Sequence, residues 1–265
     1  MDSSLKSDRE LIMEAIRQSG KAFLFTPTYI QSQDKEIAAM ALIQSPSLGI
    51  SCHPLLYDCD YISQLVRRDG RILQSLPLIL KQNPEIVKLA IESNGMNVKH
   101  ASLEMLMQNL ELIELAVSKN GLALQHVTQH PTFMQYLKSH KISNQKQTTS
   151  YLEVIIEKAL EQNPMALQYC PDSYRSNRDV VLNLLSRNGM VLEFVSSELQ
   201  HDLEVVNTAL RQNANSLQFV PYEIICKNER SVLSAIMQQN NIQALKYYPK
   251  ERLWSMYEKI LNETS

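Results

Sequence analysis

Residues 177–221, NRDVVLNLLSRNGMVLEFVSSELQHDLEVVNTALRQNANSLQFVP, contain one pattern twice, beginning at Asn177 and again at Asp202. In each copy, apolar residues fall three, four, seven and eight places after the Asp or Asn. This spacing is typical of one face of an α-helix, whereas a strand would alternate. A junction pair, Asn188-Gly189 or Asn213-Ala214, then ends the pattern. We name the predicted helix helix A, and we count positions in it from the Asp or Asn.

The same pattern recurs along the 265-residue chain, with junction pairs spaced by 26, 24, 25, 26, 43, 25, 25 and 27 residues. Such a period predicts an array of nine repeats of about 25 residues, in which the interval of 43 holds an insertion. The other pairs are Ser19-Gly20, Ser45-Pro46, Asp69-Gly70, Asn94-Gly95, Asn120-Gly121, Asn163-Pro164 and Asn240-Asn241. We expect repeats 1–5 over residues 1–130, the insertion over 131–150, and repeats 6–9 with a C-terminal capping helix over 151–265, all in one continuous solenoid.

Helix A carries predicted capping residues at both ends. Its first position is Asp or Asn in eight repeats, and only the sixth repeat, with Leu152, lacks it. The predicted N-caps, whose side-chain oxygens accept N–H groups of the first turn, are Asp8, Asp34, Asp58, Asn83, Asn109, Asn177, Asp202 and Asn228. An acid two places later suits the helix dipole. Position +7 is mostly Ala, which lets a neighbour approach closely. We expect the Asn-Gly pairs to end helix A in the left-handed conformation of helix C-caps.

A shorter helical segment, helix B, follows each junction pair, as in Ala166–Cys170 and Val191–Val195, and runs into Pro, Ser or Thr. Helices this short are marginal alone, so each repeat must bury its apolar face on its neighbours. The predicted fold is all-α: a right-handed, tetratricopeptide-like solenoid of about nine two-helix repeats. For helix B and its exit the pattern fits either one helix or two short turns. In the insertion, Phe133, Met134 and Leu137 are expected to pack on the array, and 141–150 to form a polar loop. Trp254 and Tyr257 are assigned to the capping helix.

Composition excludes several classes of protein. Net charge is −2, which argues against nucleic-acid binding because that requires a basic surface. No apolar run approaches the ~20 residues of a membrane span, and the polar N-terminus predicts no signal peptide. Cysteine occurs four times without a CxxC pair, at Cys52, Cys59, Cys170 and Cys226, which favours free thiols in a reducing compartment. We therefore expect a cytoplasmic protein without a membrane span.

The unit D-x-E-V-V-x-x-A-L-x-x-N-G-x-A-L-x-(Y/F)-V-(S/P) resembles a repeat family of unassigned function. That family occurs in protist proteins and in effectors that intracellular bacteria inject into host cells. Residues 177–199 and 202–224 match it best, and the resemblance covers about 220 of the 265 residues. Repeat 2, with Ser45-Pro46, and repeat 6, with Leu152, depart from it. The resemblance implies a helical array and secretion into a host cytosol, and it transfers no catalytic motif.

No nucleotide-binding glycine loop, hydrolase elbow or metalloprotease motif occurs, so we expect no enzyme activity and no cofactor. An enzyme whose site is assembled across repeats is the alternative. Cys52-His53 with Cys59 does not match zinc-ligand spacing, and His126 with His130 lacks a third ligand. His100 and His126 share a column with aromatic residues of other repeats. Packing between repeats is the favoured explanation for that column, and a row of rings lining a groove is the alternative.

The outward positions +5, +6, +9 and +10 of helix A vary while the inward positions are constant, and solenoids use such faces for binding. Arg is favoured at interfaces. The sequence therefore predicts a protein–protein interaction scaffold that binds a host protein or another bacterial effector; reading of RNA by one repeat per base is disfavoured by the net charge. The candidate partner-binding residues are Arg17, Gln64, Arg67, Arg68, Lys88, Glu92, Lys119, Glu157, Glu161, Arg187 and Arg211.

Overall fold

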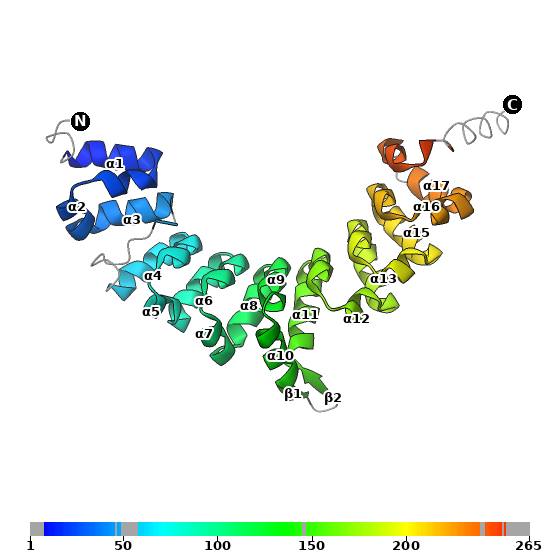
Figure 1. The fold of residues 1–265 in the computed structure, drawn as a ribbon, viewed down its shortest axis with the longest axis horizontal. Coiled ribbons are helices and arrows are strands. Elements are labelled where there is room, and N and C mark those ends of the chain that lie inside the picture. The colour runs from blue at the N-terminus through cyan, green and yellow to red at the C-terminus, as the bar shows by residue number, and fades with distance from the viewer. Residues whose placement is uncertain are drawn as a thin grey trace. The chain divides into compact units, whose positions relative to one another are not determined.

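The computed structural model describes residues 8–45, 47–48, 58–144, 147–238, 242–250 and 252. Over these residues the chain is an all-α helical repeat with one short β-hairpin, which confirms the predicted fold class (Figure 1). The chain divides into two compact units, Met1–Gln162 and Asn163–Ser265. The handedness of the array, the count of nine repeats and a single continuous solenoid stay predictions. Cys52, His53 and the capping helix with Trp254 and Tyr257 lie outside the described residues.

The described residues of unit 1 contain six A helices together with shorter elements. The A helices are α1 (Arg9–Gln18), α3 (Lys35–Gln44), α4 (Cys59–Arg68), α6 (Pro84–Ser93), α8 (Glu111–Lys119) and α11 (Tyr151–Gln162). The 3-10 helices are η1 (Gly20–Phe25), η3 (Gly70–Ser75), η4 (Gly95–His100) and η5 (Gly121–Ala123). The short α-helices are α2 (Thr28–Gln33), α5 (Leu78–Lys81), α7 (Leu103–Gln108), α9 (Leu124–Thr128) and α10 (Pro131–Ser139). Within this unit, α4, α6, α8 and α11 lie side by side in chain order (Figure 1).

Unit 2 repeats the same plan over its described residues. Its A helices are α13 (Arg178–Arg187), α15 (Leu203–Gln212) and α17 (Glu229–Met237), packed in that order. Its 3-10 helices are η6 (Pro164–Tyr169), η7 (Gly189–Phe194), η8 (Ala214–Phe219) and η9 (Ile242–Tyr247). Its short α-helices are α12 (Asp172–Arg175), α14 (Ser197–Gln200) and α16 (Tyr222–Lys227).

Each repeat therefore forms two layers and a connector. Over the described residues, the A helices pack on one another within each unit and so do the 3-10 helices. The A helices that also pack on the 3-10 helix before them are α3, α6, α8, α11, α13 and α15. The predicted helix B is this 3-10 helix, and its exit is a separate short α-helix, as in η7 and α14. Among the repeats whose helix B is described, only repeat 5 continues it as an α-helix, α9.

The inward columns of helix A form the core. Val205, Val206, Ala209 and Leu210 of α15 are fully buried, and the equivalent residues of α6 are buried in the same way. Burial of each such side chain contributes roughly 1.5–3 kcal/mol relative to exposure. The first repeat is the exception, since Leu11 is 44% exposed and the +7 alanine of α1 is exposed. In the interior repeats, the +7 alanine packs under the 3-10 helix of the preceding repeat.

Six of the predicted N-caps are confirmed by side-chain hydrogen bonds to first-turn N–H groups. They are Asp8, Asp34, Asp58, Asn83, Asn177 and Asp202. The prediction is wrong for Asn109 and Asn228, whose amides donate backward to the carbonyl oxygens of Met105 and Ile224. An Asn side chain carries a donor that Asp lacks, so it can close the preceding short helix and leave the next one without a side-chain cap.

Repeat 6 has an N-cap that the column at Leu152 does not show, because α11 begins earlier than the other A helices relative to its junction pair. Ser150 Oγ accepts the N–H of Glu153 at 3.3 Å, and the Glu153 carboxylate accepts the N–H of Ser150 at 3.0 Å. This reciprocal arrangement is a capping box of the form S-x-x-E. Repeat 6 therefore does not lack a cap, and its helix is longer, at 12 residues.

The Asn-Gly junctions do not adopt the left-handed conformation that the sequence analysis expected. Asn94 has φ −162° and ψ 122°, which is extended, and its side-chain oxygen accepts the N–H of Met96 to begin η4. Gly95 is needed for a different reason. A Cβ there would lie 2.2 Å from the carbonyl oxygen of Ala116, in the A helix of the next repeat. The glycine thus permits close approach of successive repeats, and it does not supply a special backbone angle.

The insertion belongs to unit 1 and is more ordered than a polar loop. Phe133 and Leu137 of α10 are buried as predicted, and the Tyr136 hydroxyl donates to the carbonyl oxygen of Met107 at 3.0 Å. The expected loop at 141–150 is instead an antiparallel hairpin, β1 (Lys141–Asn144) with β2 (Gln147–Ser150), in which Lys141 pairs with Ser150. Its polar composition does not prevent this, because a hairpin satisfies backbone groups whatever its side chains are.

Candidate functional site

The predicted partner-binding residues all lie on exposed surface of the A helices. In unit 1 they are Arg17 on α1, Gln64, Arg67 and Arg68 on α4, Lys88 and Glu92 on α6, Lys119 on α8, and Glu157 and Glu161 on α11. In unit 2 they are Arg187 on α13 and Arg211 on α15. We call this surface of unit 1 the outer A face. It is polar, because the large exposed apolar residues of unit 1 lie mostly on the short elements, at Leu24, Phe25, Tyr29, Leu78 and Ile79.

The +10 column of this face also has a structural role. Gln212 Oε1 accepts the N–H of Gly189 at 2.5 Å, and its Nε2 donates to the carbonyl oxygen of Arg187 at 3.1 Å. In unit 1, Gln162 Oε1 accepts the N–H of Gly121 at 2.5 Å. These glutamines satisfy backbone groups at the junction of the preceding repeat. Part of the polar set at +10 therefore joins repeats, and the freer outward positions are +5, +6 and +9.

Charged residues at position +1 join successive A helices at their N-terminal ends. Arg9 pairs with Asp34 at 2.9 Å and with Glu36 at 2.5 Å in the next repeat. Lys35 pairs with Asp58 in the same way, at 3.0 Å. In unit 2, Arg178 pairs with Asp202 at 3.0 Å and with Glu204. The predicted dipole role of the acid at +2 is thus combined, in two repeats, with an ion pair to the preceding repeat.

These contacts shift the pKa of the capping carboxylates. Partial burial alone would raise the pKa of Asp34, but the Arg9 guanidinium and the N–H groups of the helix start bring it below its ordinary value. The pKa of Asp202 is lowered by Arg178 and its own N–H partners against the same opposing effect of burial. Both carboxylates are therefore ionised near neutral pH, as an ion pair with arginine requires.

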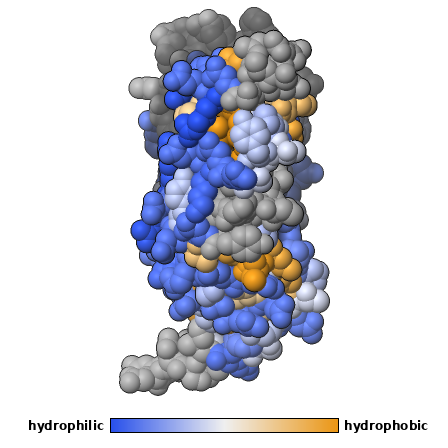
Figure 2. Space-filling view, turned by 90° about the vertical axis from the view of Figure 1, so that its left-hand side faces the viewer, coloured by the Kyte–Doolittle hydropathy of each residue, from blue (hydrophilic) through white to orange (hydrophobic). Residues whose placement is uncertain are grey.

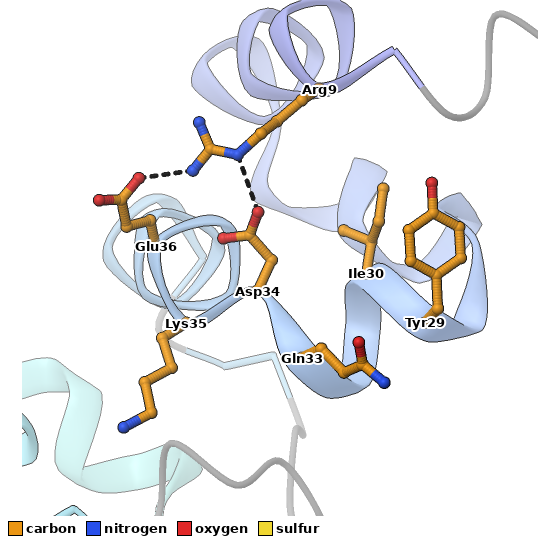
Figure 3. Close-up of a pocket in the computed structure, with 7 residues that line it drawn as sticks. All are labelled: Arg9, Tyr29, Ile30, Gln33, Asp34, Lys35 and Glu36. Atoms are coloured by element: carbon orange, nitrogen blue, oxygen red, sulfur yellow. Dashed lines mark hydrogen bonds and ion pairs between the residues drawn. The ribbon is translucent and has the colours of Figure 1, made fainter.

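A hollow of about 550 Å³ lies where α1, α2 and α3 meet, around the first of these joints. Figure 3 shows Arg9 reaching from α1 toward Asp34 and Glu36, with Tyr29, Ile30 and Gln33 on the short helix beside it and Lys35 pointing away. The two cationic and two anionic side chains of this lining balance each other, and Lys35 is paired with Asp58. This hollow is a structural joint and has no excess charge to attract a ligand.

A second hollow, of about 560 Å³, lies on the outer A face between α8 and α11. Its lining is acidic, with Glu111, Glu114 and Glu161 against Lys158 as the one cation among its lining residues, together with Leu115, Ser118 and Gln162. The Glu114 carboxylate accepts from both the Lys158 ammonium and the Tyr151 hydroxyl. We call it the acidic hollow.

Glu114 organises the acidic hollow. Partial burial would raise its pKa, but the hydrogen bonds from Lys158 and Tyr151 prevail and lower it. Burial and the adjacent Glu114 carboxylate raise the pKa of the Tyr151 phenol, so this hydroxyl stays protonated and donates. Glu111 at +2 and Tyr151, just after the Ser150 cap, fall outside the outward columns, so sequence reasoning on those columns alone does not find them.

The predicted basic strip is only partly available. Arg17 pairs with Glu14 at 3.1 Å on its own helix. Arg67 and Arg68 end α4 with exposed side chains, and neither forms an ion pair with another described residue. The predicted acidic region is better organised, because Glu161 lines the acidic hollow and Glu157 is exposed one turn earlier on α11.

The histidines and cysteines do not form a metal centre in the described part of the chain, where no group of three or more His, Cys, Asp or Glu is placed to hold an ion. Cys59 is exposed, Cys226 is half-buried, and burial raises the pKa of the Cys170 thiol to about 12, which makes it unreactive. The ring column is half-buried in both units, except for exposed Phe25 and Tyr247. Among the helices described, none combines the length and apolarity needed to cross a membrane.

Figure 2 shows one face of the molecule as mostly hydrophilic, with hydrophobic side chains gathered in separate small patches. No continuous apolar surface is visible there, so contacts made on this face depend largely on polar and charged groups.

The comparisons with known proteins assign the chain to a family but not to an activity. The model of a domain of unknown function, DUF4116, matches residues 1–31, 58–107, 155–200 and 177–225, together more than half of the chain. The chain belongs to this family. The three longer matches each span two of the repeats described above, and two of them overlap by one repeat. No curated protein and no solved structure matches the chain.

Proposed function

We propose that this member of the DUF4116 family is a non-enzymatic protein-interaction scaffold that binds a protein partner on the outer A face of unit 1. The partner we propose is a host protein or another bacterial effector, because the repeat resembles those of injected effectors. The observation that carries the proposal is the acidic hollow: two successive A helices build it from outward side chains, while their inward side chains are committed to the core.

The charge of the acidic hollow indicates the chemistry of the partner. Three carboxylates face one ammonium, and the Lys158 ammonium is already paired with Glu114. A Lys or Arg side chain of the partner, placed beside exposed Glu111, would find an excess of opposite charge, and such complementarity favours association and specificity. Exposed Arg67 and Arg68 on the same face would meet acidic groups of the partner.

The first experiment is affinity capture with the purified chain as bait, from lysates of its own cell and of a host cell, followed by mass spectrometry. A partner retained at ~0.3 M salt depends on more than exposed charge contacts, because screening at that strength is strong. Binding of the isolated partner is then measured by surface plasmon resonance with two charge-reversal variants, Glu157→Lys with Glu161→Lys, and Arg67→Glu with Arg68→Glu.

The matched control reverses exposed charges outside the outer A face, with Lys21→Glu on η1 and Lys138→Glu on α10. Circular dichroism and thermal melting confirm that every variant is folded. We expect at least one face variant to weaken binding by tenfold or more, and the control to change it by less than twofold. Affinity that is unchanged in both face variants would place the binding site elsewhere.

A further inference from the structure

The 3-10 layer of unit 1 carries a cationic surface that is separate from the outer A face. His100 ends η4 and His126 lies in α9, at the same position of two successive repeats, and η4 packs on η5, which leads into α9. Both rings are half-buried, so each presents an edge to solvent. The Gln125 amide lies 3.0 Å from His126 Nε2 and fixes the orientation of that ring.

Cationic side chains surround the two rings. Lys99 precedes His100 in η4, and Lys81 reaches from α5, where its ammonium donates to the carbonyl oxygen of Gln74 at 2.7 Å. His130 follows α9. The pKa of His100 is lowered to about 4 by burial and then by Lys99, Lys81 and His126. The pKa of His126 is lowered by burial, Lys99 and His130. All the charges that shift these two rings are positive.

The repeat itself does not require this charge. In unit 2 the ring column holds Tyr169, Phe194, Phe219 and Tyr247; Gln, Glu and Gln precede the first three, and Lys246 precedes Tyr247. The first three rings are half-buried like the two histidines, so the packing role of the column is met by uncharged rings. The basic residues gathered around His100 and His126 therefore need an explanation other than packing.

We propose that the surface formed by Lys99, His100 and His126, flanked by Lys81 and His130, binds an acidic, extended segment of a protein. Neighbouring helices pack about 8–10 Å apart, and three residues of extended chain span about 10 Å. Carboxylates three residues apart, as in Glu-x-x-Glu, therefore span about the general distance between neighbouring helices. The donors are imidazole N–H and lysine ammonium groups spread along the array, whereas phosphate sites usually gather arginine forks or backbone N–H groups around one anion.

If the segment binds beside the two imidazoles, its affinity should depend on pH, which contact with the lysines alone would not produce. A carboxylate beside each imidazole favours the imidazolium, so binding raises the pKa of His100 and His126 and takes up protons. The segment must then bind more tightly at pH 5.5 than at pH 7.5. The other groups that act on the rings are Lys99 of η4, Lys81 of α5 and His130, and none of them is acidic, so none reverses this sign.

The test uses the full chain and a fluorescein-labelled 13-residue peptide with Glu at every third position and Gly or Ser between, in 50 mM salt. A peptide with Gln in place of Glu is the matched ligand. The variants are Lys99→Glu and His100→Gln with His126→Gln. Lys246→Glu is the matched control, because Lys246 precedes Tyr247 in η9 as Lys99 precedes His100 in η4, and it makes the same change in net charge.

We expect saturable binding of the Glu peptide that Lys99→Glu weakens by roughly tenfold or more and Lys246→Glu does not. The double histidine variant should lose both affinity and the increase toward pH 5.5. Equal losses in the Lys99 and Lys246 variants, equal binding of the Gln peptide, or displacement by inorganic phosphate at the concentration of the peptide would each overturn the proposal. The Arg67→Glu and Arg68→Glu variant should bind the peptide normally, which separates this surface from the outer A face.

Discussion

Gly95→Ala tests the close approach of successive repeats. A Cβ at residue 95 would lie 2.2 Å from the Ala116 carbonyl oxygen, against 3.4 Å or more for ordinary contacts. The obstacle is backbone, and it cannot rotate away, because that oxygen also accepts the N–H of Asn120 at 2.9 Å. η4 and α8 must therefore separate by about 1 Å, or the C-terminal hydrogen bond of α8 must break.

The expected loss of stability follows from two opposing effects. Overpacking of this kind costs about 1–3 kcal/mol, sometimes more. Replacing Gly by Ala restricts the unfolded chain, which stabilises the folded protein by about 0.4–1 kcal/mol where the backbone angles suit Ala, as they do here. The backbone of α8 and the hydrogen bond from the Asn120 N–H hold the Ala116 oxygen in place, so we expect an overpacking cost in the upper part of its range. The net loss of stability should then be about 1–3 kcal/mol.

The assay is urea unfolding followed by circular dichroism, with native-state hydrogen exchange of η4 and α8 amides to locate the effect, since repeat arrays can unfold in parts. Ala116→Gly should not rescue the variant, because the clash is with the oxygen and not with the Ala116 methyl group. Ala214→Gly is the reference change: this junction already holds Ala, so it should cost only the ~1 kcal/mol of glycine's entropy. A Gly95→Ala protein as stable as the parent, or more so, would refute the steric argument.

Two further changes test the helix starts. Ser150→Ala should destabilise α11 by about 1 kcal/mol while Glu153→Gln has a smaller effect, because Gln retains the capping-box acceptor; hydrogen exchange of first-turn amides measures both. Asp202→Asn keeps the cap but loses the carboxylate that pairs with Arg178. Because the pKa of Asp202 is lowered in the fold, its contribution to stability is complete above the unfolded value of about 3.8 and is lost as pH falls through the lower folded value. The stability difference between the parent and this variant, measured as urea midpoints, should therefore shrink progressively as pH falls below about 4, and a difference that does not shrink at all would exclude the ion pair as its source.

The sequence predicts helix A well because its information is local. Cap, apolar stripe and small +7 residue recur in register and are confirmed in α6 and α15, and α13 has the cap and the stripe with Leu184 at +7. The junction was predicted at the right place with the wrong conformation. Asn and Gly favour left-handed angles in isolation, but the need for glycine here arises from the Ala116 oxygen, which would lie 2.2 Å from a Cβ at residue 95. That oxygen belongs to the next repeat, so no local rule contains it.

The candidate site was predicted in outline. Periodicity identifies outward columns, so the exposure of Arg67 and Glu161 follows from their positions. Which outward residues cooperate does not follow. Gln212 and Gln162 serve the backbone of a preceding repeat, and Tyr151 joins Glu114 across 37 residues, because contacts between helices depend on packing geometry that a one-dimensional period omits.

One contact between repeats can nevertheless be predicted from the sequence. Within each unit, the residue at +1 of one repeat lies near the cap of the next. Where +1 is basic, the next cap is Asp, as in Arg9 with Asp34, Lys35 with Asp58 and Arg178 with Asp202. Where +1 is uncharged, the residue at the next cap position is Asn, as in Cys59 with Asn83, Pro84 with Asn109 and Leu203 with Asn228, although only Asn83 of these three accepts first-turn N–H groups.

Asp and Asn cap a helix about equally well, so capping alone does not explain this division. A charge at the cap gains an ion pair only where a cation faces it, because without one the carboxylate exceeds an amide only by its interaction with the helix dipole. The choice between Asp and Asn therefore depends on whether the preceding repeat places a basic residue at +1. Exchange of whole repeats should be tolerated when it preserves these pairs, and the pairs give the array a means of fixing the order of units that are otherwise nearly alike.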